Sequence, residues 1–116
     1  MTLSFCSFSS GSSGNCYLIK SERTAILVDA GISGKKIYEG LELTGTPREH
    51  LAALLITHEH SDHTKSVKTL IKKEKSLKAY ANALTWSQLS CPVCEDQKAV
   101  FETGDTFSVG DITVKT

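Results

Sequence analysis

Short apolar runs alternate with polar turns at the start of the chain. Residues 3–8 and 16–20 are short apolar and aromatic segments, and residues 24–31 form a nearly continuous apolar run. Runs of this length predict strands, and the third is typical of a strand buried on both faces. We therefore expect a meander of three strands. The glycine-rich stretch SSGSSGN at 9–15 predicts a tight turn or a loop that closely approaches another segment.

Helical patterns follow the meander. Ser33 suits the N-cap of a helix that runs to about Leu43, with Ile37 and Leu41 on its inner face. The sequence TPRE at 46–49 has the pattern of a capping box with proline at the first helical position. It predicts one short helical turn.

Strands and helices alternate through the rest of the chain. The run at 51–57 predicts a buried strand, and the amphipathic pattern at 63–75 predicts one helix with lysines on its outer side. Asn82 suits the cap of a helix to about Leu89. Further strands are predicted over 77–81, 99–102, 106–109 and 111–115. This order indicates an α/β or α+β layer, a mixed sheet with helices on one outer face, in one domain.

The charge balance excludes a global attraction to nucleic acid or an anionic membrane. Lys plus Arg and Asp plus Glu both number 13, and the hydrophobic content of 40% indicates a globular chain. No apolar run approaches the length of about 20 residues that a membrane span needs, and the N-terminus lacks the regions of a secretory signal. We therefore expect a cytoplasmic protein with no membrane partner and with free cysteine thiols.

Residues 57–64 read THEHSDHT and hold three of the chain's four histidines. Imidazole nitrogens and carboxylate oxygens are the usual ligands of zinc and related divalent metals. His58 and His60 lie two residues apart, so their side chains can point to one side of a loop. Asp62 and His63 come at the start of the predicted helix and can face a second point. The pattern predicts metal binding, against the alternative of a solvated turn of accidental composition.

This cluster is expected to be half of a dinuclear site. Four ligands divided between two metals give each metal two, whereas a catalytic zinc normally takes three protein ligands and a water. No histidine follows His63, and the solitary His50 is interpreted as structural or exposed. Cys91 and Cys94 form a single C-x-x-C pair, for which a metal role, redox pairing and a plain loop all remain open.

The cluster and its surroundings resemble the metallo-β-lactamase superfamily. THEHSDH matches the H-x-H-x-D-H signature of that superfamily and follows an apolar strand. ILVDAG at 26–31 resembles the strand that ends in Asp-x-Gly, and GSSGNCYLI at 11–19 resembles the opening of the YycJ/WalJ-like branch. The resemblance covers essentially the whole chain and implies the N-terminal half of a four-layered αββα sandwich.

The remaining ligands of the family lie in the second half of its domain and are absent here. We therefore expect residues 1–116 to be a partial hydrolase domain, truncated at its C-terminal end and inactive alone. A single half would have one sheet with an uncovered inner face. We expect self-association through that face.

The resemblance also implies roles for individual residues. The metal ligands would be His58 and His60 for one ion, and Asp62 and His63 for the other. Asp62 would also orient the attacking hydroxide. Asp29 and Thr57 would support the histidine loop from beneath.

The implied chemistry is hydrolysis by a hydroxide that two divalent metals activate. Zinc is the expected metal, and the same ligands accept manganese or iron. In this branch the expected reaction is phosphodiester hydrolysis of an exonuclease type on DNA. A thioester or small-ester hydrolase of the same superfamily and a metal-binding module without catalysis are the alternatives. The lysines at 65, 68, 72, 73, 75 and 78 fit either a phosphate-facing patch or a solvated helix face.

Overall fold

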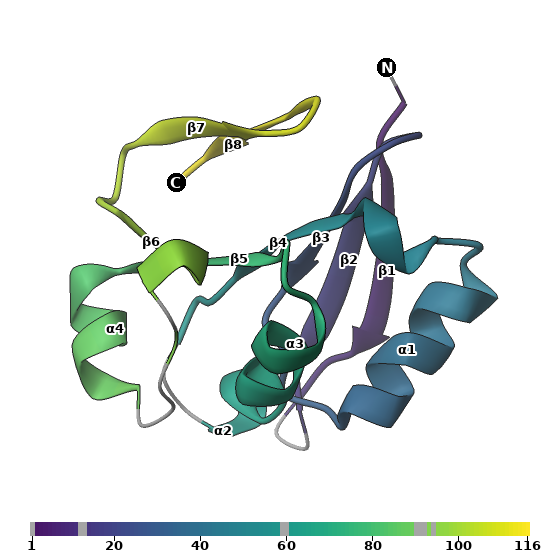
Figure 1. Cartoon of the computed structure of the whole chain (residues 1–116), viewed down its shortest axis with the longest axis horizontal. Coiled ribbons are helices and arrows are strands. Elements are labelled where there is room, and N and C mark those ends of the chain that lie inside the picture. Colours follow the sequence, from purple (N-terminus) through teal and green to yellow (C-terminus); the bar gives the residue numbers. More distant parts are fainter. Residues whose placement is uncertain (1, 12–13, 59–60, 90–92, 94) are drawn as a thin grey trace.

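One mixed sheet of six strands organises the chain (Figure 1). The computed structural model describes residues 2–11, 14–58, 61–89, 93 and 95–116, with the backbone alone at 61 and 62. The strands are β1 (Ser4–Ser9), β2 (Cys16–Lys20), β3 (Ala25–Val28), β4 (Leu51–Leu55), β5 (Lys78–Asn82) and β6 (Lys98–Phe101), adjacent in that order. The first three pair antiparallel, which confirms the predicted meander, and β3 to β6 pair parallel.

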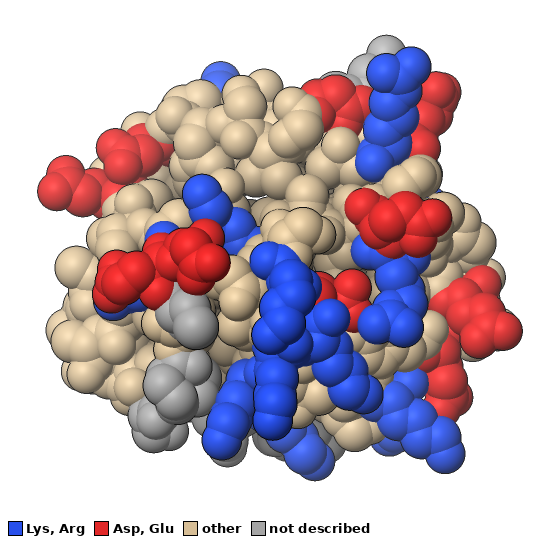
Figure 2. Space-filling model, in the orientation of Figure 1, with Lys and Arg blue, Asp and Glu red and all other residues tan. Residues whose placement is uncertain are grey.

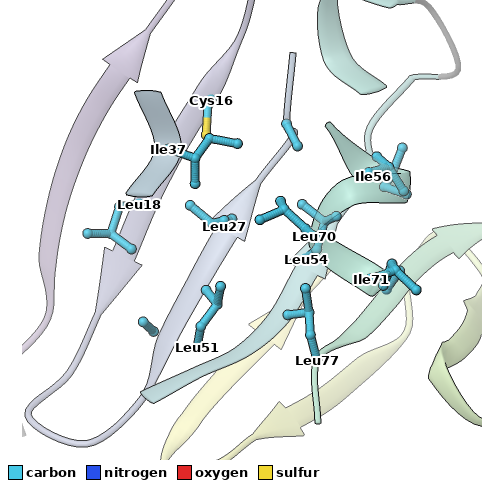
Figure 3. Close-up of a cluster of buried hydrophobic side chains, with 14 of the residues drawn as sticks. Cys16, Leu18, Leu27, Ile37, Leu51, Leu54, Ile56, Leu70, Ile71 and Leu77 are labelled. Atoms are coloured by element: carbon cyan, nitrogen blue, oxygen red, sulfur yellow. The ribbon is translucent and has the colours of Figure 1, made fainter. Parts of the chain in front are cut away.

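Helices cover one face of this sheet (Figure 1). They are α1 (Gly34–Leu43), α2 (Ser61–Thr64), α3 (Val67–Lys73) and α4 (Ala83–Gln88), with single 3-10 turns η1 (Arg48–His50) and η2 (Glu95–Gln97). Apolar side chains of α1 and α3 meet those of β2, β3 and β4 in the main core, shown in Figure 3. The mixed sheet with helices on one outer face is confirmed. Within the described part of the chain, no helix is long and apolar enough to cross a membrane.

Local sequence signals explain where α1 and α4 begin. The Ser33 hydroxyl accepts a hydrogen bond from the Lys36 N–H at 3.3 Å, and the Asn82 side chain accepts one from the Thr85 N–H at 2.8 Å. Both are N-cap bonds that satisfy a free helical donor. The expected caps are therefore confirmed.

The capping box expected at 46–49 is wrong, although a single helical turn does form there. The turn η1 begins after Pro47 without a side-chain cap bond. The Thr46 hydroxyl is engaged elsewhere. It accepts from Lys20 Nζ at 3.1 Å and lies 2.9 Å from the Thr44 hydroxyl.

The single helix expected over 63–75 is also wrong, because it divides into α2 and α3 at Lys65 and Ser66. Ser66 is buried, and its N–H donates to the Ala30 carbonyl at 2.8 Å. Its hydroxyl donates to the Ile32 carbonyl. The Ser66 N–H is thus bonded to the loop after β3, and that bond takes the place of an intrahelical one.

The inner face of the sheet is covered in part. The hairpin of β7 (Thr106–Val109) and β8 (Ile112–Lys115) lies on the side away from the helices (Figure 1). Its Val109 and Ile112 pack against Ile26 and Ala53 in a second buried cluster. The expectation of a wholly uncovered face is therefore corrected. An apolar hollow remains open on the sheet, lined by Phe5, Tyr17, Ile19 and Val28.

The loop before β2 packs against the loop after β3. The Gly31 N–H donates to the Asn15 carbonyl at 2.8 Å. Gly14 has a φ of 144°, and a Cβ added there would lie 2.5 Å from the Gly31 carbonyl oxygen. Only glycine fits both the backbone conformation and the space. The close approach predicted for the glycine-rich stretch is confirmed at this residue, while Ser12 and Ser13 lie outside the described residues.

Candidate metal centre

Asp29 lies at the edge of the sheet where the parallel strands β3 and β4 end. Its φ of 63° is in the left-handed region, which Asp adopts more readily than most residues. Because this conformation does not continue a strand, β3 ends at Val28, three residues before the predicted limit of 31. The Asp29 N–H donates to the Leu55 carbonyl at 2.7 Å. The side chain is only 3% exposed. A carboxylate buried to this degree requires hydrogen-bond donors.

Three donors meet the two carboxylate oxygens of Asp29. The Thr57 N–H donates to Oδ1 at 2.8 Å, and the Thr57 hydroxyl donates to Oδ2 at 2.6 Å. His63 Nδ1 lies 2.7 Å from Oδ2. An ionised carboxylate only accepts, so His63 must carry a proton on Nδ1. The neutral imidazole then has its lone pair on Nε2.

The Thr57 hydroxyl extends this network to His58. Its oxygen lies 3.0 Å from His58 Nδ1. Since the hydroxyl has one proton and gives it to Asp29, it accepts from His58, which is therefore also protonated on Nδ1. The rings of His58 and His63 lie side by side, with centroids 4.7 Å apart and planes at 42°.

The donor set fits a divalent metal. Histidines that bind metals through one ring nitrogen almost always donate from the other to a carboxylate, carbonyl or water, which sets the tautomer and the ring orientation. His58 and His63 have this arrangement, with a hydroxyl and a carboxylate as their acceptors. In both neutral rings Nε2 is the nitrogen with the lone pair that a metal requires.

The structure brings together four of the six residues expected at the site. These are Asp29, Thr57, His58 and His63. His60 and the side chain of Asp62 lie outside the described residues, as do Cys91 and Cys94. Within the described residues, no group of three or more His, Cys, Asp or Glu side chains is arranged to hold a metal ion.

Backbone bonds between distant segments hold His63 in place. The Ala30 N–H donates to the His63 carbonyl at 2.7 Å, and the Ser66 N–H donates to the Ala30 carbonyl. Sequence reasoning missed this role of Ser66. A serine directly before the apolar Val67 is a signal for a helix start, and that signal could have located the break between α2 and α3.

Cys16 lies near Asp29 but does not supply a thiolate. Burial, and secondarily the negative charge of Asp29, raise the pKa of the Cys16 thiol to about 12. It is therefore a neutral thiol at physiological pH and packs as a small apolar side chain in the main core. Cys16 and Cys6 are both free, as expected.

A cavity of about 320 Å³ opens beside Thr57, between the sheet and the β7–β8 hairpin. Leu55, Phe101 and Phe107 contribute apolar walls, and Asn82 contributes a polar group. The Phe101 and Phe107 rings are stacked with centroids 6.0 Å apart. The network around Asp29 therefore borders a hollow with mostly apolar walls.

A family comparison agrees with this geometry. Residues 10–85 match the sequence model of the metallo-beta-lactamase superfamily. The chain belongs to this superfamily. Membership implies divalent metals, usually zinc, and agrees with the pairing of the two imidazoles with Thr57 and Asp29.

Relatives of known name are substantially longer than this chain. It is 43% identical over 111 residues to exodeoxyribonuclease WalJ of Streptococcus pneumoniae serotype 2 (strain D39), covering 91% of this chain and 41% of that protein. It is 37% identical over 118 residues to exodeoxyribonuclease YycJ of Bacillus anthracis, covering 99% of this chain and 44% of that protein. The chain thus spans about two-fifths of the length of these relatives.

A solved structure shares the superfamily fold. The metallo-beta-lactamase fold protein YhfI of Bacillus subtilis superposes with a TM-score of 0.75 at 17% identity. The match covers 99% of this chain and 52% of that protein. At this identity the likeness concerns the fold alone.

The hydrogen-bond network predicts the tautomers of the two histidines. Nitrogen-15 NMR at a pH where both rings are neutral should show His58 and His63 protonated on Nδ1. In Thr57→Val the acceptor for His58 is lost, so His58 should shift toward the Nε2-protonated form while His63 keeps its Asp29 partner. Because one of the lost hydrogen bonds is to the buried Asp29 carboxylate, the free energy of unfolding should also fall by about 1.5 to 3 kcal/mol.

Thr57→Ser is the matched control, because it keeps the hydroxyl, and it should retain both tautomers. If His58 kept its Nδ1 proton in Thr57→Val, the bond to the Thr57 hydroxyl would not be what sets the tautomer.

Proposed function

We propose that this chain contributes the first part of a dinuclear-metal site that hydrolyses phosphodiester bonds, in an exonuclease-like reaction on DNA. The observation that carries the proposal is the pair of imidazoles, His58 and His63, both turned by Nδ1 bonds to the Thr57–Asp29 network. Membership of the superfamily supports the metal. The names of the two exodeoxyribonuclease relatives support the substrate class.

In this proposal the ligands are divided between two ions. They are His58 and His60 for the first, and Asp62 and His63 for the second. Zinc is the expected metal, with manganese or iron accepted by the same ligands. Bound metals would lower the pKa of a water and stabilise negative charge on the attacked phosphoryl group.

Two further roles in the reaction would fall to side chains of this chain. Asp62 would orient the attacking oxygen. Asp29 would hold His63 directly and His58 through Thr57, so that neither ring has to reorder when a metal binds.

Metal-dependent hydrolysis by the natural full-length protein tests this proposal. We expect it to bind divalent metal and to hydrolyse bis-nitrophenyl phosphate. His58→Ala and His63→Ala each remove a proposed ligand. Each substitution should lower the rate of hydrolysis by more than about 100-fold. That is the largest loss typical of removing a residue that only hydrogen-bonds to a metal ligand. Metal content and initial rates are the two measurements.

His50→Ala is the matched control, because His50 is half-buried in η1 and has no proposed role in the site. It should retain both metal and activity. Metal binding without hydrolysis would favour a non-catalytic metal-binding module. Turnover of a thioester but not of the phosphodiester would favour the ester-hydrolase alternative. Absence of bound metal would refute the site itself.

We also propose that this chain self-associates through the hollow lined by Phe5, Tyr17, Ile19 and Val28. Phe5 is 67% exposed and stacks on Tyr17 at a centroid distance of 5.9 Å, which leaves an apolar surface in water. Light scattering of the 116-residue chain should show a mass that rises with concentration. A monomer mass at every concentration would exclude this association.

The proposed location is the cytoplasm. The free thiols of Cys6 and Cys16 support a reducing compartment. Recovery of the protein outside the cell membrane on fractionation would contradict this location.

A further inference from the structure

A stripe of lysines runs from the turn before α3, along that helix, to the start of β5. Val67, Leu70 and Ile71 point into the core, whereas Lys68 and Lys72 are exposed four residues apart. Residues at this spacing lie on one face of a helix. We define the lysine stripe as the exposed residues Lys65, Lys68, Lys72, Lys73, Lys75 and Lys78.

The stripe has almost no acidic neighbours in the sequence. From residue 63 to residue 78 there are six lysines and one acidic residue, Glu74. The Glu74 carboxylate is bound to Arg48 at 2.6 Å and accepts from the Tyr38 hydroxyl at 2.6 Å. Burial acts to raise the pKa of Glu74, but its hydrogen bonds to Tyr38 and Arg48 and the positive charges of Arg48 and Lys73 outweigh it, so the pKa is lowered. The single acidic group is therefore bonded to Arg48 and interacts with one lysine of the stripe, Lys73.

A neutral chain thus carries a positive strip, with acidic side chains on either side of it on the same face (Figure 2). Figure 2 shows Lys and Arg side chains gathered over α3 and continuing to the edge where α2 lies in Figure 1. Lys72 and Lys73 in the last turn of α3 suit the helix dipole, but Lys68 in the first turn does not. Like charges at i and i+4, as at Lys68 and Lys72, also weaken a helix. The stability of α3 therefore does not explain why the lysines gather there. A bound polyanion would offset the repulsion between their positive charges.

The chemistry of the stripe favours nucleic acid over a membrane surface. A membrane-bound amphipathic helix needs exposed apolar side chains, yet the apolar residues of α3 are buried and its exposed positions are lysines and Thr69. The seven-residue helix α3 is about 10 Å long. One strand of duplex DNA carries a phosphate about every 3.4 Å of the helix axis, so this length lies along roughly three phosphates.

The stripe begins next to the candidate metal centre. His63 and Ser66 are both bonded to Ala30, and Lys65 lies between them. We infer that the lysine stripe is a track for the phosphodiester backbone of DNA, which leads the strand along α3 to the site at Asp29. This inference rests on the proposed function, because it names how the same site receives its substrate.

Salt-dependent binding, without turnover, tests the track. Binding of a fluorescently labelled DNA duplex to the natural full-length protein is measured by anisotropy in EDTA at several salt concentrations. Removing two phosphate contacts with Lys68→Gln/Lys72→Gln should reduce the slope of log K against log salt by about 2. Glutamine has a helix propensity close to that of lysine, so α3 should remain folded, and circular dichroism checks this.

Arg23→Gln/Lys36→Gln is the matched control, since it removes two exposed positive charges outside the stripe. Its slope should equal that of the unchanged protein. Equal slopes for all three proteins, or equal reductions in both variants, would overturn the track. Binding to vesicles that contain phosphatidylserine, without binding to DNA, would overturn it as well. Because turnover is not measured, DNA binding that depends on the stripe would stand even if hydrolysis failed.

Discussion

The candidate site depends on the hydrogen bonds that the carboxylate of Asp29 accepts. This carboxylate is buried, and it accepts hydrogen bonds from the backbone and the hydroxyl of Thr57 and from the imidazole of His63. Each bond has an ionised acceptor in a poorly solvated position, where such bonds are strongest and the loss of a partner is most costly. One side chain thereby holds His63 directly and His58 by way of the Thr57 hydroxyl.

Strand pairing and loop contacts together place the hydrogen-bond partners around this carboxylate. Parallel pairing of β3 with β4 brings Asp29 and Thr57 to the same sheet edge, although 28 residues separate them in the chain. The helices cover one face and the β7–β8 hairpin covers part of the other. The loop of Gly14 closes on Gly31, and Ser66 closes on Ala30. These contacts determine the path of the loop from Asp29 to Gly31, which in turn supports His63.

Local patterns predicted the parts of the structure that depend on local physics. The strand at 16–20, the Ser33 cap and the Asn82 cap are confirmed, because strand alternation and capping need only neighbouring residues. The placement of His58 shortly after a strand is confirmed as well, although β4 ends at Leu55 and not at the predicted residue 57. The resemblance to the superfamily added Asp29 and Thr57, which the structure places beside His58 and His63.

The errors lie where a distant segment competes for a local group. The Thr46 hydroxyl could have capped η1, but Lys20 from β2 reaches it. The helix expected over 63–75 breaks because Ser66 bonds to Ala30 and Ile32, and β3 ends early because Asp29 turns toward Thr57. Packing of the hairpin on Ile26 and Ala53 was missed because it depends on the tertiary arrangement of two segments, which periodicity does not report.

The most direct test of the account is the zinc affinity of Asp29→Asn in the natural full-length protein, measured by competition with a chromophoric chelator. An asparagine has only one acceptor oxygen, which the Thr57 backbone N–H requires. Its NH₂ group then replaces the oxygen that accepts from His63 Nδ1, so His63 must change tautomer to accept a hydrogen bond there. We predict zinc binding about 10- to 100-fold weaker than in the unchanged protein. The exposed Asp96→Asn should have no effect. Equal zinc affinity in a folded Asp29→Asn protein would contradict the claim that Asp29 prepares the histidines for metal.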